Sequence, residues 1–256
     1  IYLAFVGRFA ACLGQATPKL LEAFRTGGGV SWAEFGEDAR IGQAEQNRPV
    51  FLRLLARDWL PQIHDVHARL GANPPARVAD IGCGVGWSTI AIAQAYSLAR
   101  VDGYDLDAPS LDTARTNATA YGVADRARFL QRDVSDPSLQ GQYDLVVGFE
   151  MLHDLARPVE TLEVMRGLLS PGGAVIIMDE RVAESFTAPG DEVERLFYGF
   201  STLCCLPAGM ADKPSAGTGT VMRVDTLRRY ATEAGFDRVE VLPIEHDLFR
   251  LYRLHP

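Results

Sequence analysis

A glycine-rich turn between an apolar segment and a helix-like segment constrains this chain more than any other feature. Residues 78–86 read Val-Ala-Asp-Ile-Gly-Cys-Gly-Val-Gly, and residues 87–96 follow with the composition of a buried helix. Glycines at alternate positions let the backbone bend sharply and let a ligand lie close to the main chain. The helix behind the turn offers unpaired N–H groups and a positive dipole end, which suit an anionic group. The pattern therefore predicts a strand, a ligand-binding turn and a helix.

The spacing of these glycines differs from that of the dinucleotide-binding fingerprint. In G-x-G-x-x-G the third glycine counted from Gly82 would fall at position 87, which is Trp87. The chain instead reads D-x-G-x-G-x-G, beginning at Asp80 at the end of the expected strand. A lone glycine-rich turn also occurs in other α/β folds. The segments that follow are therefore needed to identify the fold.

Those segments come in the order of a parallel α/β sheet. Asp105 ends a second apolar strand, where an acid can accept hydrogen bonds from both hydroxyls of a ribose. Asp107 lies just beyond it and is expected to be solvated. A Pro near the start and a Gly after the end delimit a helix at 109–121. Further strands are predicted at 100–104, 127–131, 143–148, 174–178, 239–242 and 246–254, with a helix at 224–234.

Taken together, these features resemble the class I S-adenosylmethionine (SAM) methyltransferases. The turn from Asp80 to Gly86 is similar to motif I of that family, and Ser170-Pro171-Gly172-Gly173 before an apolar strand is a frequent family feature. The resemblance implies an α/β fold with a Rossmann-like, seven-stranded mixed sheet of strand order 3-2-1-4-5-7-6, the seventh strand antiparallel. It also implies SAM as the cofactor and S-adenosylhomocysteine (SAH) as the product.

The resemblance assigns a set of residues to the cofactor. Asp105 would hold the ribose, with Leu106 against the adenine face, and Asp133-Val134 would contact the adenine amino group. Trp87 and Ser88 would flank the methionine carboxylate. The complete expected set is Asp80, Gly82, Cys83, Gly84, Gly86, Trp87, Ser88, Asp105, Leu106, Asp133, Val134 and Phe149, with Thr26 and Gly27 closing over the methionine end.

His153 is the best candidate for a catalytic base. Methyl transfer from a sulfonium is a displacement in which a base helps a hydroxyl acceptor, whereas a neutral amine can react without one. His153 follows the fourth strand, toward which the transferred methyl points in this fold, and Asp154 or Glu150 would fix its tautomer. Two alternatives stay open. His153 would cap the next helix or form a hydrogen bond with the backbone, and Glu150 would instead line the SAM pocket near the methionine end.

Several other side chains have both a functional and a structural interpretation. Tyr198, Cys204 and Cys205 would face the acceptor from a lid helix, although their helical spacing favours burial. Arg223 would reach an acidic acceptor or pair with a carboxylate. His246, beside Asp247, is expected to be structural because it lies opposite the ligand edge.

Two segments lie outside the minimal core. Residues 1–62 are predicted to form an N-terminal helical segment with helices at 3–13, 19–24 and 37–60 and a glycine turn between. Residues 63–256 would form the SAM-binding domain, with an insertion at 181–221 that contains a helix at 191–203 and a loop rich in Gly, Pro and Ser at 207–220. We predict that both additions form a lid over the methyl donor; the alternative is packing on the sheet edge.

A narrower resemblance is to bacterial, largely actinobacterial, methyltransferases that carry a winged-helix domain in front of the catalytic domain. It rests on FRTGGGV (24–30), QNRPVF (46–51), FEMLHDLARPVE (149–160), DERVAESFTAPGDEVERL (179–196) and GTVMR (219–223). That leading domain is missing here and the chain starts at Ile1, so we expect a truncated N-terminus. Because the domain contributes to dimers in related enzymes, a homodimer stays open.

Composition excludes some partners and leaves others. A formal net charge of −8 argues against a large nucleic-acid footprint, and the stretch Gly148-Phe-Glu-Met-Leu-His153 replaces the motif usual in nucleic-acid amino-methyltransferases. No bilayer-spanning segment, secretory signal or metal-ligand spacing is visible, and the four cysteines suggest reduced thiols in the cytoplasm.

The expected reaction is methylation of a small molecule at a hydroxyl or amine. The sequence does not distinguish O-, N- and C-methylation. A SAM-sensing winged-helix regulator without turnover and an NAD-type oxidoreductase are the alternatives.

Overall fold

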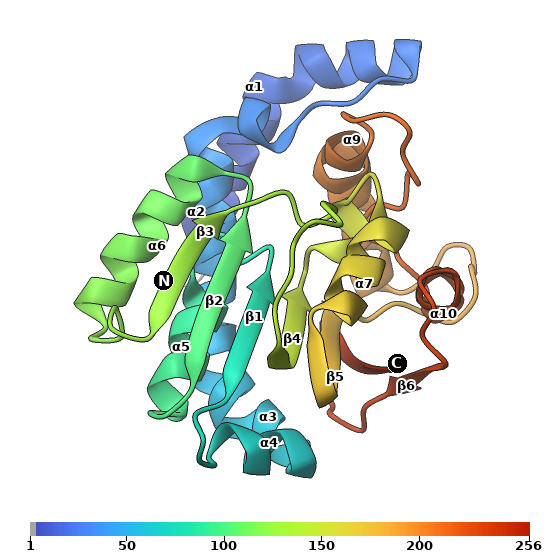
Figure 1. Cartoon of the computed structure of the whole chain (residues 1–256). Helices are drawn as coiled ribbons and strands as arrows, with labels where there is room; N and C mark the ends of the chain where they lie inside the picture. Colours follow the sequence, from blue (N-terminus) through green and yellow to red (C-terminus); the bar gives the residue numbers. More distant parts are fainter. Residues whose placement is uncertain (1–3) are drawn as a thin grey trace.

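One seven-stranded sheet organises the chain. The computed structural model describes residues 4–256, so the first residue of the helix predicted at 3–13 lies outside the described part (Figure 1). The sheet has the order β3-β2-β1-β4-β5-β7-β6, in which β7 runs antiparallel to both of its neighbours and the other pairs are parallel. The predicted fold and strand order are confirmed. The strands are β1 (Arg77–Ile81), β2 (Arg100–Asp105), β3 (Ala127–Gln131), β4 (Tyr143–Phe149), β5 (Leu169–Glu180), β6 (Arg238–Val241) and β7 (Phe249–His255).

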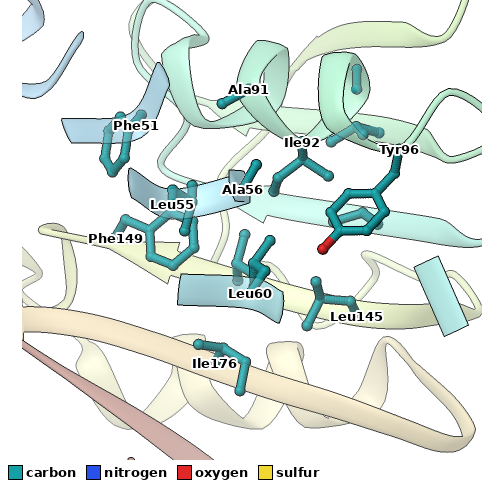
Figure 2. Packing of buried hydrophobic residues seen from close by; sticks show 14 of the residues in the cluster. Phe51, Leu55, Ala56, Leu60, Ala91, Ile92, Tyr96, Leu145, Phe149 and Ile176 are labelled. Carbon is teal, nitrogen blue, oxygen red and sulfur yellow. The ribbon is translucent and has the colours of Figure 1, made fainter. Parts of the chain in front are cut away.

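Helices cover both faces of the sheet because its central strands are apolar on both sides. Within β4, Leu145, Val147 and Phe149 point into one core and Val146 into the other, as the alternation of a strand requires. Figure 2 shows Phe51, Leu55 and Leu60 packed beside Phe149 and Leu145, so the segment that precedes the sheet in sequence contributes to its core. The first face holds η1 (Phe51–Trp59), α3 (Leu60–Gln62), α4 (His64–Leu70), α5 (Trp87–Ala95) and α6 (Ala108–Ala120), and the second holds α7 (Pro158–Gly167) and α10 (Val224–Glu233).

The N-terminal helices differ from their predicted bounds. The segments predicted at 3–13 and 19–24 form one helix, α1 (Ala4–Thr26), which continues through Pro18. A proline inside a helix costs a backbone hydrogen bond, but burial of the apolar face of α1 outweighs that cost. The helix predicted from residue 37 lies within α2 (Trp32–Val50), where a kink at Gly36, with a φ of 80° and a ψ of −165°, separates it from one preceding turn. That turn was not predicted; it starts at a capping box in which Glu34 Oε2 accepts hydrogen bonds from Ser31 N at 3.0 Å and Ser31 Oγ at 2.9 Å.

Two strands also differ from prediction. The turn predicted at 170–173 is absorbed into β5, where it appears as a register irregularity against β4, and Gly172 has a φ of 79°. The final strand begins at Phe249 rather than at residue 246. His246 stacks on Phe249 and meets Trp59 edge to face, contacts that agree with the predicted structural role. Its predicted position opposite the ligand edge is wrong, because Phe249 pairs with Glu180 at the carboxyl end of β5.

The insertion after β5 packs against the N-terminal helices. It contains α8 (Glu192–Phe200), η3 (Ser201–Cys205) and α9 (Leu206–Gly209), so the loop predicted from residue 207 is helical at its start. Cys204 joins Phe9, Leu20 and Val30 in a third apolar cluster, and Val30 N donates to Pro207 O at 2.9 Å. Two segments far apart in sequence therefore form one unit beside the carboxyl ends of the strands (Figure 1). No described helix is both long and apolar enough to cross a bilayer.

Gly29 is the position where these two segments approach most closely. A Cβ there would overlap backbone atoms of Pro207, Met210 and Ala211. We expect Gly29→Ala to lower the free energy of unfolding by about 1–3 kcal/mol, the usual cost of forcing extra volume into a packed contact. Chemical denaturation measures this change. Gly28→Ala is the matched control, since its Cβ would meet the movable Thr26 Oγ1 at 3.3 Å; equal stability of the two variants would contradict the described contact.

Candidate active site

The turn after β1 is built by glycines with left-handed backbone and by a buried acid. Gly82, Gly84 and Gly86 have φ values of 71°, 52° and 84°, which other residues rarely adopt. A Cβ on Gly86 would lie 2.7 Å from the Phe129 ring, so this position also needs glycine for space. Asp80 accepts hydrogen bonds at 2.6 Å from Ser88 Oγ and Thr89 Oγ1 and so fixes the start of α5. Burial raises the pKa of Asp80 to about 6, despite these hydrogen bonds.

Asp105, at the end of β2, faces this turn. Its Oδ2 accepts from Gly84 N at 2.8 Å and its Oδ1 from Asp107 N at 2.9 Å, and burial raises its pKa. Each carboxylate oxygen keeps capacity for a second donor. Asp107 was predicted to be solvated, and this prediction is wrong. Its side chain caps α6 and accepts hydrogen bonds from Arg40 Nε at 2.6 Å and Arg40 Nη2 at 2.8 Å. The reason is that α2 brings Arg40 to this edge of the sheet, which local sequence does not indicate.

A cavity of about 390 Å³ opens above the turn at the carboxyl ends of the strands. Parallel α/β sheets bind ligands at this edge. The cavity is lined by twelve of the predicted site residues, namely Gly82, Cys83, Gly84, Trp87, Ser88, Asp105, Leu106, Val134, Phe149, Glu150, His153 and Asp154.

Five predicted residues do not line the cavity. Asp80 and Gly86 lie behind the turn and shape it. Asp133 accepts a hydrogen bond from Ser135 Oγ at 2.7 Å and forms an ion pair with Arg157. Its carboxylate therefore has its partners outside the cavity. Thr26 donates to the Glu22 carbonyl at the end of α1, and Gly27 follows it. In their place Ser31 and Trp32, from the same connection and the start of α2, line the cavity.

His153 lies on the short helix η2 (Leu152–Asp154), with only 2% of its surface exposed. Its Nδ1 is 2.7 Å from Asp179 Oδ1 and 3.1 Å from Glu180 Oε2, and its Nε2 is 3.2 Å from Asp154 Oδ1. Burial by itself lowers the pKa of His153, but the charges of Asp179, Glu180 and Asp154 raise it well above its usual value. The predicted partner is therefore corrected in part: Asp154 contacts the ring, whereas Asp179 rather than Glu150 holds Nδ1.

The comparisons with known proteins agree with this geometry. Residues 79–175 match the model of a methyltransferase domain, which begins within β1 and ends within β5. The chain therefore contains a methyltransferase domain with the fold of the class I SAM-dependent methyltransferases. Among relatives, it is 34% identical over 148 residues to the ubiquinone biosynthesis O-methyltransferase of Bordetella avium, covering 53% of this chain and 60% of that one.

A second relative and a solved structure are also similar to this chain. The chain is 30% identical over 122 residues to the malonyl-[acyl-carrier protein] O-methyltransferase of Halalkalibacterium halodurans, covering 46% of this chain and 44% of that one. It thus spans less than two thirds of the length of these two relatives. The solved structure of PigF with SAH has the same fold at a TM-score of 0.72 and 19% identity, covering 99% of this chain and 74% of that one.

The cavity of this methyltransferase suits SAM. The left-handed glycines leave the main chain of the turn open to a ligand, and Asp105 presents carboxylate oxygens beside it. The buried Trp87 Nε1 has no hydrogen-bond partner among the described residues, so a donor is available on the same wall. Apolar Leu106 and Val134 line the cavity beyond Asp105. These are the groups that a ribose, an anionic tail and an adenine require.

Glu150, directly after β4, has an unusual backbone. Its φ is 51°, and it is the single non-glycine residue with positive φ in the described chain. Non-glycine residues in this region store strain, which persists at ligand sites when the surroundings fix the backbone. Burial raises the pKa of Glu150 to about 8, although the His153 charge and a hydrogen bond with Asn47 act against that shift. Glu150 is therefore held in the cavity wall largely as the neutral acid at pH 7.

Sequence reasoning missed several residues of this methyltransferase site. Asp179 and Glu180 end β5, and the rule that ligands bind at the carboxyl ends of parallel strands could have found them. No local pattern identified the helix residues Asn47 and Phe51, which reach the cavity from α2 and η1. Of the lid candidates, Cys204 and Cys205 line the cavity, whereas Tyr198 contacts Arg223, which pairs with the buried Glu194.

Proposed function

We propose that this methyltransferase transfers the methyl group of SAM to a hydroxyl of a small molecule. The observation that carries the proposal is the pairing of His153 Nδ1 with Asp179 Oδ1 at 2.7 Å, within the wall of the same cavity as the glycine turn and Asp105. A histidine that is oriented by a buried carboxylate is suited to take a proton from a hydroxyl. A neutral amine has no need of such a base, so the geometry favours oxygen as the nucleophile. No observation on the described residues favours the regulator alternative.

In this mechanism the chain's residues position the groups and move one proton. SAM supplies a methyl group that is already activated on a positively charged sulfur. Asp105 and the glycine turn hold the nucleoside end, and Trp87 and Ser88 lie beside the opposite end. Asp179 keeps the proton of His153 on Nδ1, which leaves Nε2, 3.2 Å from Asp154 Oδ1, as the nitrogen that accepts the proton of the acceptor hydroxyl. After the transfer, Asp179, Glu180 and Asp154 stabilise the protonated ring.

We further infer that the N-terminal helices and the insertion act together as a lid. Phe9 and Trp32 from one segment and Phe197 and Phe200 from the other line the same cavity. Their shared cluster couples the two segments, and a cavity that closes over its ligands excludes water from the transfer.

The direct test is a turnover assay of the chain with SAM and a panel of small phenols and alcohols. Release of SAH, together with a mass gain of one methyl group on the acceptor oxygen, supports the proposal. A folded chain that binds SAH but transfers methyl only to nitrogen or carbon would contradict the assignment of oxygen. A folded chain that fails to bind SAH would contradict the donor site itself.

The pH dependence of kcat/KM tests the role of Asp179. Because the neutral ring is the base, activity should fall as the pH drops through the pKa of His153, which lies well above 6.5. Asp179→Asn removes a charge that raises this pKa, so the acid limb should move to lower pH by about one to three units. Asp225→Asn, at an exposed position on α10, is the control and should leave the profile in place. An unmoved acid limb in Asp179→Asn would contradict the proposed pairing.

A further inference from the structure

The cavity wall is rich in carboxylates and poor in cations. Glu150, Asp154, Glu180 and Asp212 line it in addition to Asp105 at the nucleoside end. Arg40 is the one Lys or Arg side chain among the described lining residues. Its Nε and Nη2 both donate hydrogen bonds to Asp107. His153 is thus the one cation that faces the carboxylates at the acceptor end. Its charge cannot balance all of them.

Three oxygens of these acidic side chains have no hydrogen bond, although two of them are ion-pair neighbours of His153, with Nδ1 3.1 Å from Glu180 Oε2 and Nε2 3.2 Å from Asp154 Oδ1. They are Glu150 Oε2, Asp154 Oδ1 and Glu180 Oε2, each with almost no solvent exposure. Glu180 is the most informative, because only 7% of the residue is exposed and its side chain lines the cavity. A buried acceptor oxygen without a hydrogen bond carries a desolvation cost, which a ligand donor would remove.

Aromatic rings line the same cavity as these oxygens. The cavity is lined by Phe9, Trp32, Phe51, Phe149, Phe197 and Phe200. Aromatic faces attract cations as well as planar apolar groups, so the lining accommodates an aromatic ring and an ammonium at the same time. A carboxylate or phosphate on the acceptor would instead meet acidic side chains and no free Lys or Arg among the described lining residues.

We propose that the methyl acceptor is a hydroxylated aromatic compound that carries a basic amine, with the ammonium bound by Glu180 and Glu150 beside His153. This inference rests on the proposed function and assigns the substrate class of the same cavity. Burial raises the pKa of both glutamates, and a nearby positive charge lowers it. Binding of an ammonium therefore releases protons to the buffer.

The test uses SAH-saturated protein and matched pairs of probes. Tyramine is compared with 4-hydroxyphenylacetate, and dopamine with 3,4-dihydroxyphenylacetate, by calorimetry in two buffers of different ionisation enthalpy. We expect the amine of each pair to bind at least about tenfold more tightly, as one charge-assisted hydrogen bond requires, and to release protons. Equal binding within each pair, preference for the acids, or no binding by the amines would overturn the inference.

Two variants locate the recognition. Glu180→Gln keeps the shape of the side chain and should reduce the preference for the amine by about 10- to 100-fold, while SAH binding is unchanged. Asp225→Asn, exposed on α10 and outside the cavity, should leave both unchanged. If Glu180→Gln weakens SAH binding instead, Glu180 serves the amino group of the donor and the inference is wrong. A wild-type chain that binds no SAH contradicts the proposed function rather than this inference.

Discussion

Replacement of His153 by alanine is expected to lower kcat by about 10²- to 10⁴-fold, the usual contribution of a positioned general base. The reason is that His153 lines the cavity and its Nδ1 lies 2.7 Å from Asp179 Oδ1, which leaves Nε2 as the proposed proton acceptor. Steady-state kinetics with SAM and the acceptor found in the panel measure the effect. SAH affinity should be unchanged, because the nucleoside end of the site is formed by Asp105 and the glycine turn.

A second variant separates chemistry from folding. Removal of the imidazolium leaves buried Asp179 and Glu180 without their positive partner, which by itself can destabilise the chain. His153→Gln keeps a polar side chain of similar size, and thermal unfolding of both variants reports whether they fold. If the folded glutamine variant retains wild-type kcat, His153 is not the base.

Asp105→Ala is expected to weaken SAH binding by about 10²- to 10⁴-fold. A carboxylate that accepts two ribose hydroxyls contributes about 1.5–3 kcal/mol for each charge-assisted hydrogen bond, and 1.4 kcal/mol corresponds to tenfold in affinity. The variant also frees Gly84 N, which Asp105 holds at 2.8 Å, so the turn loses a support as well. Calorimetric titration with SAH measures the change.

Asp133→Ala is the matched control for this variant. Asp133 also follows the end of a strand and was predicted to contact the adenine, yet its carboxylate contacts Ser135 and Arg157 and does not line the cavity. Its removal should leave SAH affinity close to that of the wild type. A loss as large as that of Asp105→Ala would contradict the described position of Asp133.

Local patterns sufficed for the sheet because its segments carry their signals within a few residues. The predicted strand at 127–131 coincides with β3, and the predicted second strand with its terminal Asp105 coincides with β2. The N-terminal helices were less predictable. The helices predicted separately at 3–13 and 19–24 form one helix, and α1 continues through Pro18 because its buried face packs on α2 and the insertion, a contact between segments far apart in sequence.

Some residues of the candidate site could be predicted from local sequence, and others could not. The turn from Gly82 to Gly86 and the acid at Asp105 were predictable, because the backbone conformation and the end of a strand depend on adjacent residues. The partner of His153 was not, since Asp154 is next to it in sequence whereas Asp179 comes from a different strand. Asp107 was misassigned for the same reason, because Arg40 approaches it from α2.

The sequence by itself determined the strands and the ligand-binding turn, because strand alternation, glycine conformation and terminal acids are properties of short segments. The strand order followed from the family resemblance that those segments carry. Only the tertiary structure decided which side chains share the cavity. Glu150, Asp154, Glu180 and His153 come from the ends of different elements, and the aromatic wall comes from the N-terminal helices and the insertion. Their charges and distances arise from packing between segments distant in the chain, which no local pattern specifies.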